Sequence, residues 1–272
     1  GQTGDYVAYL EPDSGEFTRF DLPDGAGPHN VIVGEFVWYS GNRAANIGRL
    51  SQDGDDLELF PMPESGARDP HTLVFDSQGT IWFTVQNGNY VGRLEPSSGD
   101  VRLARVPTSR AGPYGIIVDR DDRPWFTEFG TNKIASIDRE TFEIEEFVLP
   151  RSGARPRRIG ATSDGLIWYV DYAQGRLGRF DPATEEFREW LLPGGTGARP
   201  YGMAVDHRDR IWLVETGSFN RFVGFQPATE EFFSNVPIPS GGGVVRHMQF
   251  DLATRSVWFG TDAGTIGRAR VE

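Results

Sequence analysis

The sequence repeats with a period of 43 to 46 residues, and this period limits the possible folds more than any other feature. Tryptophans mark it, each inside a short apolar run: Trp38, Trp82, Trp125, Trp168, Trp212 and Trp258. Proline followed by a ring or an arginine precedes five of them, at Pro28-His29, Pro70-His71, Pro113-Tyr114, Pro156-Arg157 and Pro200-Tyr201. A period in this range is typical of solenoids, propellers and other repeat arrays.

Each repeat contains four short runs of alternating apolar and polar residues, which predict β-strands. In the second repeat the runs are residues 72–75, 81–84, 90–94 and 101–106. The 34 glycines and 18 prolines lie between such runs and are typical of turns. No amphipathic helical stretch interrupts the pattern. Four strands per repeat predict an all-β chain folded as a β-propeller of four-stranded blades.

The repeats predict a single propeller domain over residues 1–272. We expect a partial blade at 1–27, complete blades at 28–63, 70–107, 113–150, 156–193 and 200–239, and a last blade at 244–272. Residues 2–12 align without a gap on residues 86–96, so the chain is expected to begin after the second strand of its first blade. A seven-bladed parent ring lacking part of its first blade is therefore predicted. The alternative is a six-bladed ring with one surplus strand.

The composition excludes several classes of partner and chemistry. A net charge of -12 repels a phosphate backbone, so nucleic acid is not an expected partner. No apolar run is long enough to span a bilayer, so we expect a soluble chain with no membrane partner, either cytoplasmic or periplasmic and secreted. The absence of cysteine excludes disulfides and a cysteine nucleophile. A self-contained propeller is expected to be a monomer.

Equivalent positions of the repeats point to a candidate site. The residues that follow the recurring proline are expected at one mouth of the central channel, together with the loops after the tryptophan strand. The residues expected to bind a polar or anionic small molecule there are His29, His71, Tyr114, Arg157, Arg158, Tyr201, Arg246 and His247, with the acids Glu128, Asp171, Glu215 and Asp262 nearby. The competing interpretation is that the arginines and acids simply pair at a polar mouth.

The motifs of the repeats resemble those of one enzyme family. They read Pro-His-x-aliphatic, then Asp-x-x-Gly-x-Ile-Trp-Phe-Thr, then Asn-x-Ile-Gly-Arg. This pattern resembles the streptogramin B lyases, also called virginiamycin B lyases, over the whole chain. The resemblance implies a seven-bladed propeller that opens a cyclic depsipeptide antibiotic by Mg²⁺-dependent elimination at its ester, a carbon–oxygen lyase reaction linked to antibiotic resistance.

The resemblance also implies roles for individual residues. It assigns His71 as the base, His29 as a second acid/base or substrate ligand, and Asp69 as a ligand of Mg²⁺. Gln86 stands where the family has a glutamate, and a neutral amide is a weaker ligand for Mg²⁺ than a carboxylate. Asp69 and Gln86 are therefore expected to form a weakened metal site.

Two alternatives of other classes stay open. One is a propeller without catalysis that binds a ligand or a protein through Arg157, Arg158 and Arg246. The other is a gluconolactonase-type hydrolase, which would hold Ca²⁺ among the acids of the later blades, Glu128, Asp171, Glu215 and Asp262. The identity of the metal distinguishes the three interpretations.

Overall fold

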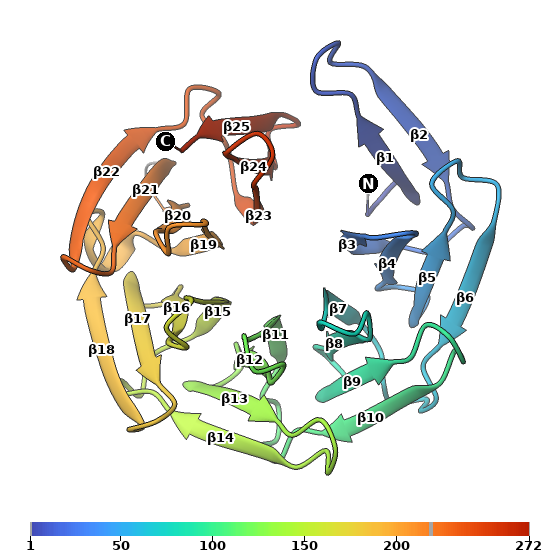
Figure 1. Cartoon of the computed structure of the whole chain (residues 1–272), viewed down its shortest axis with the longest axis horizontal. Coiled ribbons are helices and arrows are strands. Elements are labelled where there is room, and N and C mark those ends of the chain that lie inside the picture. Colours follow the sequence, from blue (N-terminus) through green and yellow to red (C-terminus); the bar gives the residue numbers. More distant parts are fainter. Residues whose placement is uncertain (1, 218–219, 272) are drawn as a thin grey trace. The chain divides into compact units, whose positions relative to one another are not determined.

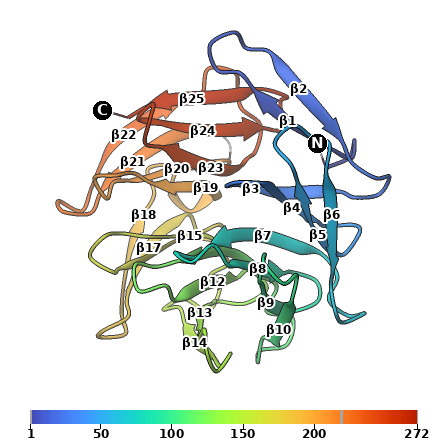
Figure 2. The same cartoon turned by 45° about the vertical axis from the view of Figure 1, so that its right-hand side comes forward.

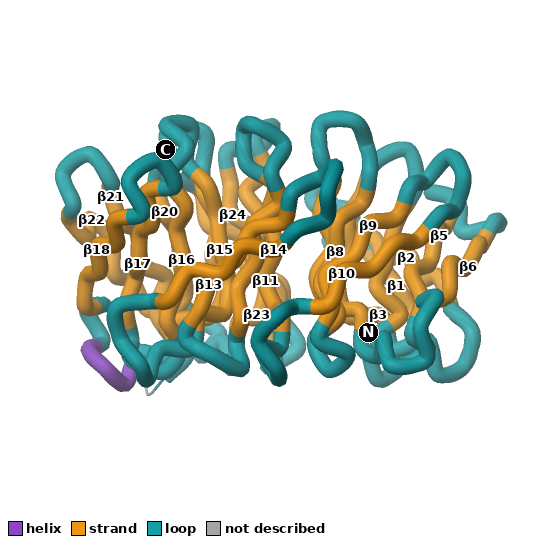
Figure 3. Tube along the Cα trace, turned by 90° about the horizontal axis from the view of Figure 1, so that it is seen from below, coloured by secondary structure: helices purple, strands orange, loops and turns teal. Residues whose placement is uncertain are grey.

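The computed structural model describes residues 2–217 and 220–271 and is built of β-strands (Figure 3). Among these residues the one helical element is a short 3-10 turn, η1 (Gly195–Gly197). None of the described helices is long and apolar enough to cross a membrane. The all-β prediction is confirmed.

Over the described residues the strands form seven sheets, in which neighbouring strands are consecutive in the chain. The first has two strands, β1 (Tyr6–Leu10) and β2 (Phe17–Asp21). The second sheet consists of β3 (Pro28–Val33), β4 (Val37–Gly41), β5 (Asn46–Leu50) and β6 (Leu57–Pro61). The third consists of β7 (Pro70–Phe75), β8 (Ile81–Val85), β9 (Tyr90–Leu94) and β10 (Val101–Arg105).

The remaining sheets follow the same plan. They are β11 (Pro113–Val118), β12 (Pro124–Glu128), β13 (Lys133–Ile137), β14 (Ile144–Val148); β15 (Pro156–Ala161), β16 (Ile167–Asp171), β17 (Arg176–Asp181), β18 (Glu186–Leu191); and β19 (Pro200–Val205), β20 (Ile211–Glu215), β21 (Arg221–Gln226), β22 (Glu231–Pro237). The last has three strands, β23 (Val245–Asp251), β24 (Ser256–Thr261) and β25 (Ile266–Arg270). Four-stranded blades are thus confirmed, and the blade number of the parent ring stays a prediction.

The chain divides into two compact units, which are described separately. Unit 1 comprises Gly1–Val118, Asp122–Phe126 and Ile137–Ile144, and unit 2 comprises Asp119–Asp121, Thr127–Ser136 and Glu145–Glu272. In unit 1 the first strands β3, β7 and β11 lie side by side, and the turned view again places β3 next to β7 (Figures 1 and 2). In unit 2 the first strands β15, β19 and β23 are neighbours (Figure 1). The prediction of a single domain stays a prediction.

A polar residue six positions before the tryptophan fixes both the first turn and the indole. The carboxylate of Asp76 accepts hydrogen bonds from the backbone N–H of Gln78 and Thr80, both at 3.0 Å, and from Trp82 Nε1 at 3.1 Å. Asp206 holds Trp212 in the same way at 2.8 Å. Because a buried indole N–H needs an acceptor, this bond lets the large ring enter the core.

The tryptophans of the repeats lie in the cores of both units. Trp38 packs with Ile47, Phe60 and Phe83 in unit 1, and Trp168 packs with Phe225 in unit 2. Five of the six marker tryptophans are buried, and Trp258 of the three-stranded sheet is half-buried. The periodic tryptophan is therefore a packing residue, which carries no chemistry of its own.

The glycine of the third strand makes room for a ring on the second strand. Tyr169 on β16 is paired with Gly178 on β17, and a methyl group on Gly178 would lie 2.0 Å from that ring. Phe83 and Gly92 repeat the pairing in unit 1. The aromatic side chain above each of these glycines therefore leaves no room for a Cβ atom.

We expect Gly178→Ala to lower the free energy of unfolding by about 1 to 3 kcal/mol, because the added methyl group overpacks the Tyr169 ring. The matched control is Gly197→Ala, since a methyl group there would have no atom within 4 Å. Urea unfolding of both variants measures the difference. Equal stability of the two variants would contradict this account of the repeated glycine.

Candidate functional site

The residues predicted for the site lie in β-bulges at the start of the first strands. The pairing of β3 with β4 shifts between Pro28 and Val31, and that of β7 with β8 shifts between Pro70 and Leu73. The same shift occurs after Pro156, Pro200 and Val245 in unit 2. A bulge leaves two residues opposite one and redirects their side chains. This irregularity therefore gives the two positions after the proline their common orientation.

In unit 1 a hydroxyl on the second strand fixes each bulge to the next sheet. Ser40 Oγ accepts a hydrogen bond from Asn30 N at 2.9 Å and donates one to the carbonyl oxygen of His71 at 2.8 Å. Thr84 Oγ1 likewise accepts from Thr72 N at 3.2 Å and donates to the carbonyl of Tyr114 at 2.7 Å. Sequence reasoning missed these hydroxyls, although a polar residue two positions after the tryptophan in an apolar strand was a usable signal.

These bulges bring three predicted residues of unit 1 together as a stack of rings. The ring centroids of His29 and His71 are 3.9 Å apart, and those of His71 and Tyr114 are 4.0 Å apart. His71 lies between the other two and is 2% exposed, whereas His29 at the end of the stack is half-buried. His29 is therefore the imidazole with solvent access.

Hydrogen bonds orient both imidazoles. His71 Nδ1 lies 3.0 Å from the hydroxyl of Thr72, and His29 Nδ1 lies 3.3 Å from the carbonyl oxygen of His71. Asn30 is buried beside them, and its amide oxygen accepts a bond from Leu73 N at 2.8 Å. A carbonyl oxygen accepts only from a protonated nitrogen, so this contact places a proton on His29 Nδ1, and Nε2 is then the nitrogen that can accept a proton when the ring is neutral.

The contacts of Asp69 and Gln86 show how well these two residues could bind a metal ion. The Asp69 carboxylate accepts a hydrogen bond from Asn87 Nδ2 at 2.7 Å, and burial raises the pKa of Asp69 to about 6, although the contact with Asn87 lowers it. Gln86 contacts Asp69 through its backbone N–H. Over the described part of the chain no three His, Cys, Asp or Glu side chains are placed to hold a metal. Asp69 and Gln86 supply one carboxylate between them, so they fit a weakly held Mg²⁺ better than a tightly bound one, because Mg²⁺ prefers anionic oxygens.

In unit 2 the predicted Arg157 is enclosed by the aromatic rings of Phe129, Tyr172 and Tyr201, and we call this arrangement the Arg157 cage. Its guanidinium carbon lies 3.8 Å from the ring centroid of Tyr201, 4.3 Å from Tyr172 and 4.4 Å from Phe129. Cation–π contacts of this kind strengthen when the cation is shielded from water. Phe129 and Tyr172 follow the second strands of their sheets, and sequence reasoning did not single them out.

Hydrogen bonds join three other predicted residues of unit 2, Arg158, Arg246 and Asp262. Arg246 forms a forked ion pair with Asp262, at 3.2 and 2.8 Å, and its backbone carbonyl accepts a bond from Arg158 Nε at 3.0 Å. Tyr201 is buried and His247 is exposed. The competing interpretation, in which arginine and acid pair, thus applies to Arg246 and Asp262.

The acids proposed for Ca²⁺ close loops of their own sheets. Asp171 Oδ1 accepts bonds from the backbone N–H of Arg155 and Ala173, at 2.9 and 3.0 Å, and Glu215 Oε1 accepts one from Gly194 N at 2.8 Å. Burial raises the pKa of both carboxyls. Among the described residues no three His, Cys, Asp or Glu side chains are grouped to hold a metal, and the Ca²⁺ interpretation stays a prediction.

Solved structures show which proteins resemble this arrangement. A streptogramin B lyase is 27% identical, with a TM-score of 0.88 over 98% of this chain and 87% of the other. A catalytically inactive histidine-to-alanine variant of virginiamycin B lyase from Staphylococcus aureus, solved with quinupristin, is 24% identical, with a TM-score of 0.89 over 100% of this chain and 89% of the other. The second likeness shows the fold alone.

A family model adds sequence evidence to this likeness. No curated protein is similar enough to count as a match. The model of the virginiamycin B lyase family, however, matches residues 5–222, which include the ring stack of unit 1 and the Arg157 cage of unit 2. The predicted resemblance is confirmed, and the chain belongs to the virginiamycin B lyase family.

Proposed function

We propose that the chain is a carbon–oxygen lyase that opens a cyclic depsipeptide, or a related ester, at the ring stack of His29, His71 and Tyr114. The observation that carries the proposal is the pair of imidazoles from adjacent sheets, stacked at 3.9 Å with one member accessible. Membership of the family supports the reaction class. Quinupristin, present in the structure of a relative, is the substrate to test first.

The proposed reaction needs one proton transfer and one bond cleavage. A base removes the proton from the carbon next to a carbonyl group, and the electrons of that C–H bond form a C=C bond to the neighbouring carbon. The bond between that neighbour and the ester oxygen breaks, and the oxygen leaves as a carboxylate. An imidazole suits the first step because its ordinary pKa lies near neutral pH.

Burial divides the roles of the two histidines. A base must come within hydrogen-bond reach of the proton it takes, and the half-buried His29 meets this requirement better than the buried His71. We therefore assign proton removal to His29 and make His71 a positioning residue, held by Thr72 and stacked between His29 and Tyr114. This reverses the order of roles that the resemblance implies.

A metal stays a prediction for this site. Mg²⁺ would stabilise negative charge on the substrate carbonyl. Gln86 and the Asn87-bonded Asp69 supply one carboxylate between them, so any ion here is expected to bind weakly and to depend on added Mg²⁺.

A binding function without catalysis is the second candidate, and the burial of His71 favours it. A propeller that holds a polar ligand needs no reachable base, and the Arg157 cage presents a rigid cation in unit 2. Binding of quinupristin without turnover would support this candidate.

The experiment is ring opening of quinupristin, followed by liquid chromatography with and without added Mg²⁺. The proposal expects a linear product from the parent chain, with a rate that rises on adding Mg²⁺. Gln86→Glu supplies a second carboxylate and is expected to respond at lower Mg²⁺, while Gln226→Glu, on β21, is the matched control. No turnover by the parent under either condition would overturn the lyase proposal.

A further inference from the structure

Three arginines line a small pocket in unit 2, away from the bulges of the candidate site. Arg208 lies in the turn between β19 and β20, Arg255 in the turn between β23 and β24, and Arg270 at the end of β25. With Thr254 they surround a cavity of about 310 Å³. The predicted residues Tyr201 and Arg246 stand at the opposite ends of β19 and β23, so the pocket is a separate feature.

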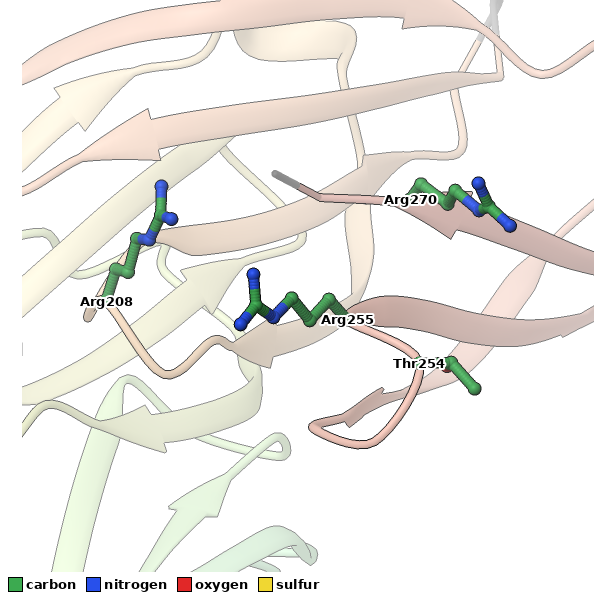
Figure 4. A pocket seen from close by; sticks show the side chains of 4 residues that line it. All are labelled: Arg208, Thr254, Arg255 and Arg270. Atoms are coloured by element: carbon green, nitrogen blue, oxygen red, sulfur yellow. The ribbon is translucent and has the colours of Figure 1, made fainter.

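The pocket brings the cationic groups of two neighbouring turns together. Figure 4 shows the side chains of Arg208 and Arg255 reaching into the space between their two turns, whereas the side chain of Arg270 on β25 extends away from them. The strands β19 and β23 that carry the turns are neighbours, and β25 pairs with β24 so that Arg270 stands opposite Ser256. The pocket is therefore defined by paired strands of one unit.

Hydrogen bonds fix the two turns that carry the arginines. Arg208 N donates to Asp206 Oδ1 at 2.9 Å, and Thr254 N donates to Asp251 Oδ2 at 3.2 Å. The carbonyl oxygen of Arg255 accepts a bond from Val271 N at 3.0 Å. The backbone at the pocket is thus organised before any ligand arrives, which reduces the ordering cost of binding.

The acids of these turns hold the turns themselves, including Thr254 of the pocket lining. Asp206 holds Arg210 and Trp212, Asp209 holds Ser163, and Asp251 holds Thr254. Within residues 2–217 and 220–271, no acidic side chain forms an ion pair with Arg208, Arg255 or Arg270. The guanidinium groups of Arg208 and Arg255 are therefore open to an anionic ligand.

We propose that Arg208 and Arg255, in the pocket that Arg270 and Thr254 also line, bind a tetrahedral oxyanion, the phosphate or sulfate group of a small molecule. Guanidinium forks match the geometry of such groups and form charge-assisted bonds to them. The lining includes no large apolar side chain, and the volume is at the lower end of ligand pockets, so the charged group carries the recognition. The proposal is independent of the lyase reaction.

The test is calorimetric titration of inorganic phosphate, and separately of sulfate, into the parent chain at constant ionic strength. We expect a dissociation constant on the order of 1 mM for at least one of the two anions, the strength of two or three charge-assisted bonds. The double variant Arg208→Gln/Arg255→Gln is expected to bind at least about tenfold more weakly. Acetate at the same concentration tests whether a carboxylate suffices.

The control variant is Arg188→Gln, which removes an exposed arginine of the same unit that pairs with Glu230. It is expected to bind phosphate as the parent does. A second measurement follows melting temperature, which the bound anion should raise in the parent and in Arg188→Gln but not in the double variant. Equal affinity in the parent and the double variant, or no saturable binding of either tetrahedral anion, would overturn the proposal.

Discussion

His29→Ala is expected to lower the rate of ring opening by at least about 100-fold, the usual contribution of a general base. The side chain is half-buried at the end of the ring stack, so its removal leaves the core packing in place. The measurement is the initial rate with quinupristin, together with urea unfolding to show that the variant stays folded. His207→Ala removes an exposed histidine stacked on Phe250 and is the matched control, with an expected rate equal to that of the parent.

His71→Ala is expected to affect both stability and activity. The side chain is 2% exposed and contacts two rings, so its loss costs about 1 to 3 kcal/mol of unfolding free energy. His71→Asn keeps a polar group there, and we expect the residual rate of this variant to retain the pH profile set by His29. A variant lacking His29 that turns over at the parent rate would contradict the assignment of the base.

Glu128→Gln is expected to remove much of the loss of stability between pH 5 and pH 9. Glu128 is 0% exposed at the end of β12, and burial, followed by the nearby Glu146 carboxylate, raises its pKa from 4.5 to about 8, although Thr131 and Lys133 act in the opposite direction. The folded chain therefore keeps a proton between these two pKa values that the unfolded chain releases. Folding stability falls as pH rises through this window, and the loss is complete above pH 8.

The size of this effect follows from the pKa shift. A pKa shift of this size corresponds to a loss of unfolding free energy on the order of 3 to 5 kcal/mol between low and high pH. Urea unfolding at pH 6 and pH 9 compares the parent with Glu128→Gln and with Glu140→Gln, an exposed acid that serves as control. The pKa of Asp69 is also raised, to about 6, and this lowers the stability of the parent and of both variants equally as pH rises. The difference in stability between the chains therefore reports on Glu128 alone. Parallel losses in parent and variant would contradict a protonated Glu128 in the fold.

The fold could be predicted from the sequence because its determinants are local and repeated. The tryptophan of the second strand, the glycine beneath an aromatic ring and the turn aspartate recur at fixed spacing, as in Asp76, Phe83 and Gly92. Each repeat shows the same pattern again, so a strand that is ambiguous in one repeat can be assigned by comparison with the others. The start of the first strand was predicted less well: in the second repeat the run was placed at residues 72–75, whereas β7 begins at Pro70.

The chemistry of the site depends on contacts between repeats, and these could not be read from one sequence. The pattern placed His29 and His71 at equivalent positions, but their different exposure arises from the order of the stack. The enclosure of Arg157 comes from rings on the loops after β12 and β16. The acids Asp171 and Glu215 looked like metal ligands, yet they bind backbone N–H groups of neighbouring loops.

Elimination and hydrolysis give products of different mass, and this difference tests the central claim most directly. The measurement is mass spectrometry of quinupristin after incubation with the parent chain in water enriched in oxygen-18. The account predicts a linear product with the mass of the substrate, a new C=C bond and no oxygen from the solvent. A product heavier by one water that carries the solvent oxygen would contradict the lyase assignment and show an ester hydrolase.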